Sequence, residues 1–74
     1  MKIYYDAEVD ALYIEFKQLK AGTAENRDLS EEIIANYGPD GKIAGLEVLN
    51  ASIVVGDVLR KVVIEVTPVQ RALT

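Results

Sequence analysis

The sequence predicts an α+β fold that is mainly β, an antiparallel β-meander of four to five strands with one short helix. Three observations predict it. Apolar and polar residues alternate over several short stretches, which is typical of half-buried strands. Turn-forming residues separate the stretches, most clearly at 38–41. The 74 residues suffice for a single small domain spanning 1–74, with 69–74 as a frayed tail or a docking segment.

The first two strands are expected at 2–5 and 11–17, joined by an acidic turn at 6–10. Aspartate side chains in such a turn can bond to the nearby backbone and close it. The predicted cross-strand pairs are Lys2–Glu15, Ile3–Ile14, Tyr4–Tyr13 and Tyr5–Leu12. A shift by one residue would turn Tyr13 and Glu15 toward the core, so the alternation fixes this register.

Residues 18–25 lose the alternation and are expected to form a surface loop. Residues 26–32 are interpreted as an extended approach to a third strand at 33–37. The capping-box spacing at 28–31 supports an alternative, a short helical turn at 30–32. The β-branched residues that follow favour the strand.

The turn at 38–41 predicts a second hairpin. Pro39 presets φ, and Gly41 can take the left-handed conformation that closes a type I turn with a bulge. The fourth strand is then 42–49, and its apolar residues on both faces indicate an interior strand. The expected pairs are Tyr37–Ile43, Ile34–Leu46 and Ile33–Glu47.

Asn50 interrupts the alternation and can cap a helix. The β-branched residues at 53–55 would keep that helix short, and they are also compatible with a strand. A fifth strand is expected at 62–66, ended by Pro68 because proline cannot donate to a strand ladder.

Composition excludes several classes of function. The chain has no cysteine and no histidine, which removes disulfides, thiolate metal sites and the commonest general base. The net charge is −4 and the basic residues are scattered, so no nucleic-acid partner is expected. No apolar run is long enough to span a membrane and no signal peptide is evident, so we expect a cytoplasmic location. No cofactor is indicated.

Two stretches, 5–14 (YDAEVDALYI) and 41–52 (GKIAGLEVLNAS), resemble the signatures of a family of small bacterial and archaeal proteins, domain-of-unknown-function family 2283. Their order and spacing also fit, and the resemblance covers most of 2–52. Asn50 departs from the aspartate expected there. The resemblance implies a small β-meander with a short helix. It also implies a bacterial or archaeal origin and a genomic setting beside small toxin-like or stress-related genes. It carries over no catalytic residues.

Asp6, Glu8 and Asp10 have the spacing of the first ligands of a calcium loop. Such a loop also needs a glycine and a closing glutamate, where this chain has Ala11 and Lys17. These carboxylates are therefore weak candidates for a cation site. The more economical interpretation is that Asp6 and Asp10 shape the turn while Glu8 is solvated.

Tyr4, Tyr13 and Tyr37 are candidate interaction residues, because tyrosine is enriched at interfaces. Ordinary packing on the sheet explains them equally well. Glu47 lies among apolar neighbours and is a further candidate, since a partly buried carboxylate can act as an acid or base. A surface charge paired with lysine or arginine is the simpler explanation of Glu47.

These features predict a non-enzymatic protein-interaction module. The sheet has apolar residues on both faces and too little chain to cover them. We expect a homo-oligomer, most simply a dimer, or a small protein partner. One form of the latter is an antitoxin-like role against a basic ribonuclease-type toxin. The alternative is a small-ligand or cation-binding domain that uses the acidic turn and Glu47.

Overall fold

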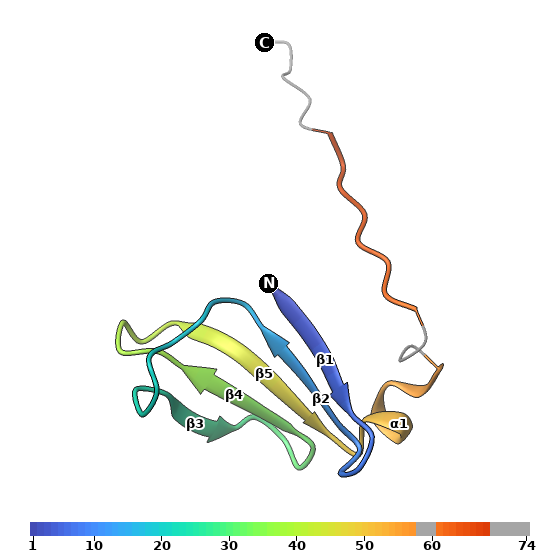
Figure 1. Ribbon diagram of the computed structural model, residues 1–74, viewed down its shortest axis with the longest axis horizontal. Coiled ribbons are helices and arrows are strands. Elements are labelled where there is room, and N and C mark those ends of the chain that lie inside the picture. Colours follow the sequence, from blue (N-terminus) through green and yellow to red (C-terminus); the bar gives the residue numbers. More distant parts are fainter. Residues whose placement is uncertain (58–60, 69–74) are drawn as a thin grey trace.

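In the computed structural model, which describes residues 1–57 and 61–68, the chain forms an open antiparallel sheet and a short helix (Figure 1). The described strands are β1 (Lys2–Asp6), β2 (Ala11–Glu15), β3 (Glu25–Asp28), β4 (Ile33–Tyr37) and β5 (Ile43–Leu49), and the helix is α1 (Ala51–Val54). The predicted fold class is confirmed. The strand order is β1-β2-β5-β4-β3. β1 therefore pairs with β2, and β3 pairs with β4, which pairs with β5. The two groups are joined by the pairing of β5 with β2.

The register of the first hairpin is confirmed at every predicted pair. Lys2 lies opposite Glu15, Ile3 opposite Ile14, Tyr4 opposite Tyr13 and Tyr5 opposite Leu12. Residues alternate between the two faces on both strands. In this register Ile3, Tyr5, Leu12 and Ile14 share one face, whereas a shift by one residue would mix the two sets, so the alternation fixes the pairing. β2 continues this pattern into β5, where Leu12 lies opposite Val48 and Ile14 opposite Leu46.

The register of the second hairpin was predicted correctly only beside its turn. Tyr37 lies opposite Ile43 as expected, but Ala35, not Ile34, lies opposite Leu46. The register shifts between Asn36 and Tyr37, so that Asn36 pairs with Gly45 and Ala44 has no partner on β4. The carbonyl of this bulged Ala44 accepts the backbone N–H groups of Phe16 and Lys17 at 2.7 and 3.1 Å. The bulged residue therefore bonds to the segment directly after β2 in place of the ladder bonds that it lacks on β4.

Because of the bulge, the predicted pair Ile33–Glu47 is wrong. Glu47 lies opposite Ile34, and Ile33 lies opposite Val48.

The extended segment expected at 26–32 is strand only over Glu25–Asp28. After it the chain turns without forming the alternative helical turn. In this turn Ser30 Oγ accepts the N–H groups of Glu32 and Ile33, at 3.3 and 3.2 Å.

Helix α1 is as short as the β-branched residues predicted, but Asn50 does not cap it by its side chain. Asn50 stands at the N-cap with φ 52° and ψ 44°, and its side chain makes no capping hydrogen bond. A left-handed backbone is unusual for a capping residue, which normally lies in the β region. Asp10, on the turn between β1 and β2, takes the capping role: its Oδ1 accepts the backbone N–H of Ser52 at 2.9 Å.

The fifth strand predicted at 62–66 is not formed. Residues 61–68 carry no strand assignment, all of them are exposed, and the segment extends away from the sheet beyond α1 (Figure 1). The described strand that the sequence did not predict separately is β3. Residues 69–74, expected to be a tail, lie outside the described part of the chain.

The sheet is a single layer with a very small core. Among the described residues the buried apolar side chains are Ala11, Ala35, Ala44, Val48 and Ala51, and no large side chain is completely buried. One side of the sheet, called here the apolar face, carries Ile3, Tyr5, Leu12, Ile14, Ile33, Ala35, Leu46 and Val48. These residues pack beside each other, but most of them stay partly accessible.

Gly41 provides a test of the turn in the second hairpin. Its φ is +80° and a side chain built there would meet nothing within 4 Å, so only backbone strain opposes a substitution. Gly41→Ala should therefore lower the free energy of unfolding by about 1 kcal/mol. Chemical denaturation would measure the loss, with Lys42→Ala, at the adjacent exposed position, as the control. A Gly41→Ala variant that is more stable than wild type would contradict the assigned turn.

Candidate interaction surfaces

The face of the sheet opposite the apolar face carries a row of polar and aromatic side chains that crosses all of the described strands. We call it the polar row, and its members are Tyr4, Tyr13, Glu47, Asn36 and Asn26. The rings of Tyr4 and Tyr13 stack with centroids 4.7 Å apart and planes 17° apart. Asn36 Nδ2 donates to Glu47 Oε2 and to Asn26 Oδ1, each at 2.8 Å.

Burial and the nearby carboxylate of Glu47 both raise the pKa of Tyr13, burial contributing more. Because the ordinary pKa of tyrosine is about 10, the hydroxyl of Tyr13 is protonated at neutral pH and can donate a hydrogen bond. The absence of a side chain at Gly45 lets Asn36 and the backbone of β2 approach this position closely. A Cβ atom there would lie 2.8 Å from the carbonyl oxygen of Ile14 and 3.3 Å from Asn36 Oδ1. Next to this glycine is a hollow of about 290 Å³, whose lining includes Tyr4, Tyr13 and the loop residue Leu19.

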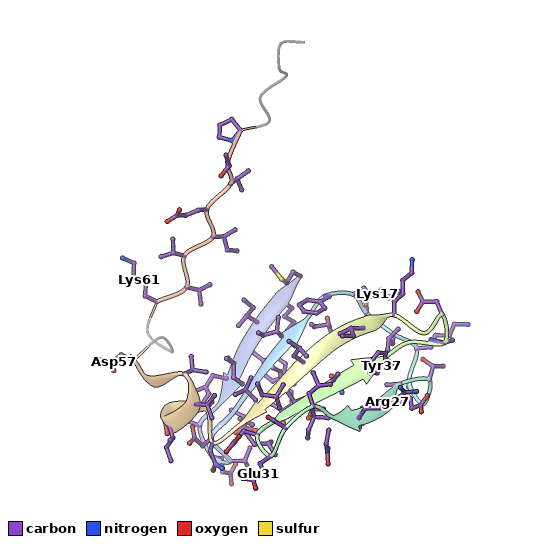
Figure 2. The ribbon with its side chains drawn as sticks, turned by 180° about the vertical axis from the view of Figure 1, so that it is seen from behind. Lys17, Arg27, Glu31, Tyr37, Asp57 and Lys61 are labelled. Carbon is purple, nitrogen blue, oxygen red and sulfur yellow. The ribbon has the colours of Figure 1, made fainter. Side chains whose placement is uncertain are left out.

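Of the four candidate interaction residues, the structure brings Tyr4, Tyr13 and Glu47 together and places Tyr37 elsewhere. Tyr37 follows Ile33 and Ala35 in the alternation of β4, so it belongs to the other side of the sheet. There the guanidinium of Arg27 lies 5.0 Å from the centre of its ring, and Figure 2 shows the two side chains on neighbouring strands. Glu47 is paired with the amide of Asn36 rather than with the lysine or arginine that was expected.

The acidic turn is used within the molecule. Asp10 Oδ1 accepts the hydroxyl of Tyr5 at 2.6 Å, and Asp10 Oδ2 accepts the hydroxyl of Ser52 at 2.7 Å. The carbonyl oxygen of Asp10 accepts the N–H of Ala51 at 3.0 Å. The bonds to the carboxylate, from the Tyr5 hydroxyl above all and from the hydroxyl and N–H of Ser52, hold the pKa of the Asp10 carboxyl below its usual value.

The other two carboxylates of the turn are less engaged. Asp6 Oδ1 accepts the backbone N–H of Glu8 at 3.0 Å, as expected of a turn aspartate, and Glu8 itself is exposed. In the part of the chain that the structure describes, no group of three or more ligating side chains is placed to hold a metal ion. The turn is therefore organised as a structural link from β1 and β2 to α1.

A second hollow lies over the apolar face. It has a volume of about 560 Å³, and its lining combines the sheet residues Ile3, Tyr5, Leu12 and Val48 with Val55, which follows α1, and Val62. Its lining is mainly apolar, in contrast to the polar row. This surface can bind an apolar partner but offers little hydrogen bonding to a polar one.

The family profile described as "Protein of unknown function (DUF2283)" matches residues 2–52, which is well over half of the chain. The chain belongs to this family. The match ends at Ser52, within α1, so it includes the described sheet, the polar row and the apolar face, but not Val55 and Val62 of the second hollow. No curated protein and no solved structure gave a match. No helix among the described residues has the length and apolar character needed to cross a membrane.

The sequence interpretation missed Asn26 and Asn36 in the polar row, and the link from Asp10 to Ser52. A signal for Asn36 was present, because asparagine is uncommon in strands and this one stands among apolar residues. The Asp10–Ser52 contact joins residues 42 positions apart. It depends on the pairing of β2 with β5, which local patterns do not reveal.

The Asp10 link predicts a dependence of stability on acid. Because the folded state holds the carboxyl pKa below its usual value of about 4, the stabilisation is complete above that pH. It is lost as the pH falls through the pKa of the folded state. Tyr5→Phe, which removes the strongest donor, should raise the pKa of Asp10 in a carboxyl NMR titration and weaken this acid dependence. Tyr4→Phe is the control, and an unchanged Asp10 pKa in Tyr5→Phe would contradict the assigned link.

Proposed function

We propose that this protein is a non-enzymatic interaction module that self-associates through its apolar face. One observation carries the proposal. The apolar face gathers eight side chains, yet within residues 1–57 and 61–68 no large apolar side chain is completely buried. Burial of apolar surface is the main driving force of association, so a second copy of the same face is a suitable partner.

The single layer of the sheet supports the same proposal. In the part of the chain that the structure describes, most side chains of the apolar face stay partly accessible. A dimer formed through the apolar face would supply the second layer that the sheet lacks.

The polar row fits this arrangement as the outer surface of such a dimer. The hydrogen bonds of Asn36 and the stacking of Tyr4 on Tyr13 form within one chain and need no partner. With the apolar face occupied, the row and its hollow would remain available to another protein. An antitoxin-like role would use this surface, and the net charge of −4 would favour a basic partner.

The alternative, a small-ligand or cation-binding domain built on the acidic turn and Glu47, is less well supported. The carboxylate oxygens of Asp10 accept hydrogen bonds from Tyr5 and Ser52. Glu47 accepts one from Asn36. A ligand that used these groups would have to replace contacts that already hold the hairpin, α1 and the sheet together.

Two neighbouring isoleucines of β4 test the proposal. Ile33 lies opposite Val48 on the apolar face, and Ile34 lies opposite Glu47 on the other face. Both are half-buried, so they are a matched pair. Ile33→Ser should weaken self-association about 10- to 100-fold, because a buried side chain of this size contributes roughly 1.5–3 kcal/mol. Ile34→Ser should weaken it far less.

Sedimentation equilibrium over a hundredfold range of concentration would measure the association constants. Circular dichroism would show that both variants remain folded at the working temperature. In the wild type, Tm should rise with protein concentration. A wild type that stays monomeric over the whole range, or equal weakening by both substitutions, would contradict self-association through the apolar face.

A further inference from the structure

Residues 61–68 have the sequence of a strand but no strand partner within the described chain. Val62, Ile64 and Val66 alternate with Lys61, Val63 and Glu65. The exposed fractions of Val62, Val63, Ile64 and Val66 are 58%, 61%, 67% and 82%. Figures 1 and 2 show the segment extended and directed away from the sheet, with Lys61 labelled at its start in Figure 2. So much exposed apolar surface on an extended backbone is suited to strand pairing.

The sheet offers an open edge of matching character at β1. In the described part of the chain β1 pairs with β2 alone and stands at one end of the strand order. Its free N–H and C=O groups can accept another strand. The opposite edge, β3, has the sequence ENRD and offers no apolar side chain. The apolar residues of 61–68 therefore have counterparts at β1 and none at β3.

An antiparallel alignment of 61–65 with β1 matches every position. The resulting pairs are Lys2–Glu65, Ile3–Ile64, Tyr4–Val63, Tyr5–Val62 and Asp6–Lys61. Opposite charges meet at both ends, and Ile64 and Val62 join the apolar face beside Ile3 and Tyr5. A parallel alignment that also sets apolar residues opposite Ile3 and Tyr5 would place Lys2 against Lys61 and Asp6 against Glu65, which is unfavourable.

We infer that residues 61–68 form a strand on the β1 edge of a second copy of this chain. The segment does not occupy its own β1 edge, although that edge is open and complementary to it. A second copy presents the same edge, and reciprocal exchange by two copies satisfies both segments and both edges around a twofold axis. The inference rests on the proposed self-association for its partner but uses the sheet edge rather than the apolar face.

Engineered cysteines can test the pairing directly because the native chain has none. Lys2→Cys and Glu65→Cys would face each other in the inferred register. A disulfide requires Cα atoms about 4.4–6.8 Å apart. Mixing the two single variants, one of them isotopically labelled, under mild oxidation should give the mixed disulfide as the main cross-linked species. Lys2→Cys mixed with Ile64→Cys, one position out of register, should give little.

Each outcome has a definite meaning. If dimers form but the mixture of Lys2→Cys and Glu65→Cys gives no cross-link, strand donation is wrong while self-association through the apolar face stands. If the double variant in one chain forms only an intrachain disulfide and the mixture none, the segment pairs within its own chain and the inference is wrong. If the protein is monomeric throughout and gives no cross-link, both proposals fail.

Charge reversal provides a second, reversible test. Lys2→Glu would place two glutamates opposite each other at two equivalent sites of the dimer. It should weaken dimerisation about tenfold. Combining Lys2→Glu with Glu65→Lys should restore the wild-type affinity, which a purely local effect of position 2 would not do. A double variant as weak as Lys2→Glu would overturn the inferred register.

Discussion

The hydrogen bonds of Asp10 join the first hairpin to α1, and much of the rest of the structure depends on them. The residue ends the turn between β1 and β2 in a left-handed conformation, with φ 52°. From there its carbonyl and carboxylate oxygens receive donors from Tyr5, Ala51 and Ser52. The start of α1 is thereby held beside the beginning of β2, where the chain leaves β5. This attachment brings Val55 over the apolar face.

The parts of the fold that were predictable depend on local alternation and on turn chemistry. Ile3, Tyr5, Leu12 and Ile14 leave a single register for the first hairpin, and Pro39 with Gly41 fixes the second turn. The bulge at Ala44 was not predictable from the same pattern. The carbonyl of Ala44 accepts hydrogen bonds from Phe16 and Lys17, which directly follow β2 and so belong to a different hairpin. One extra residue in β5 then moved Glu47 from Ile33 to Ile34.

The candidate site was predictable to the same extent and for the same reason. Tyr4 and Tyr13 follow from the register of one hairpin, so their stacking was accessible from the sequence. Glu47 joins them through the β2–β5 pairing, and Asn36 joins Glu47 only because of the bulge. Tyr37 was grouped with the other tyrosines by residue type alone, and strand alternation places it on the opposite side. Contacts between hairpins therefore decide which candidates lie together.

The family match separates the two surfaces proposed for association. The apolar face and the β1 edge lie within residues 2–52, whereas the donated segment begins at Lys61, outside the match. The single-layer sheet, whose apolar face is only partly covered within the described residues, thus lies entirely inside the family match. The inferred strand exchange would pair an element inside the family match with a segment beyond it. Its complementary charges, Lys2 with Glu65 and Asp6 with Lys61, come one from each side of that boundary. The proposed association would therefore combine a face within the family match with a strand outside it.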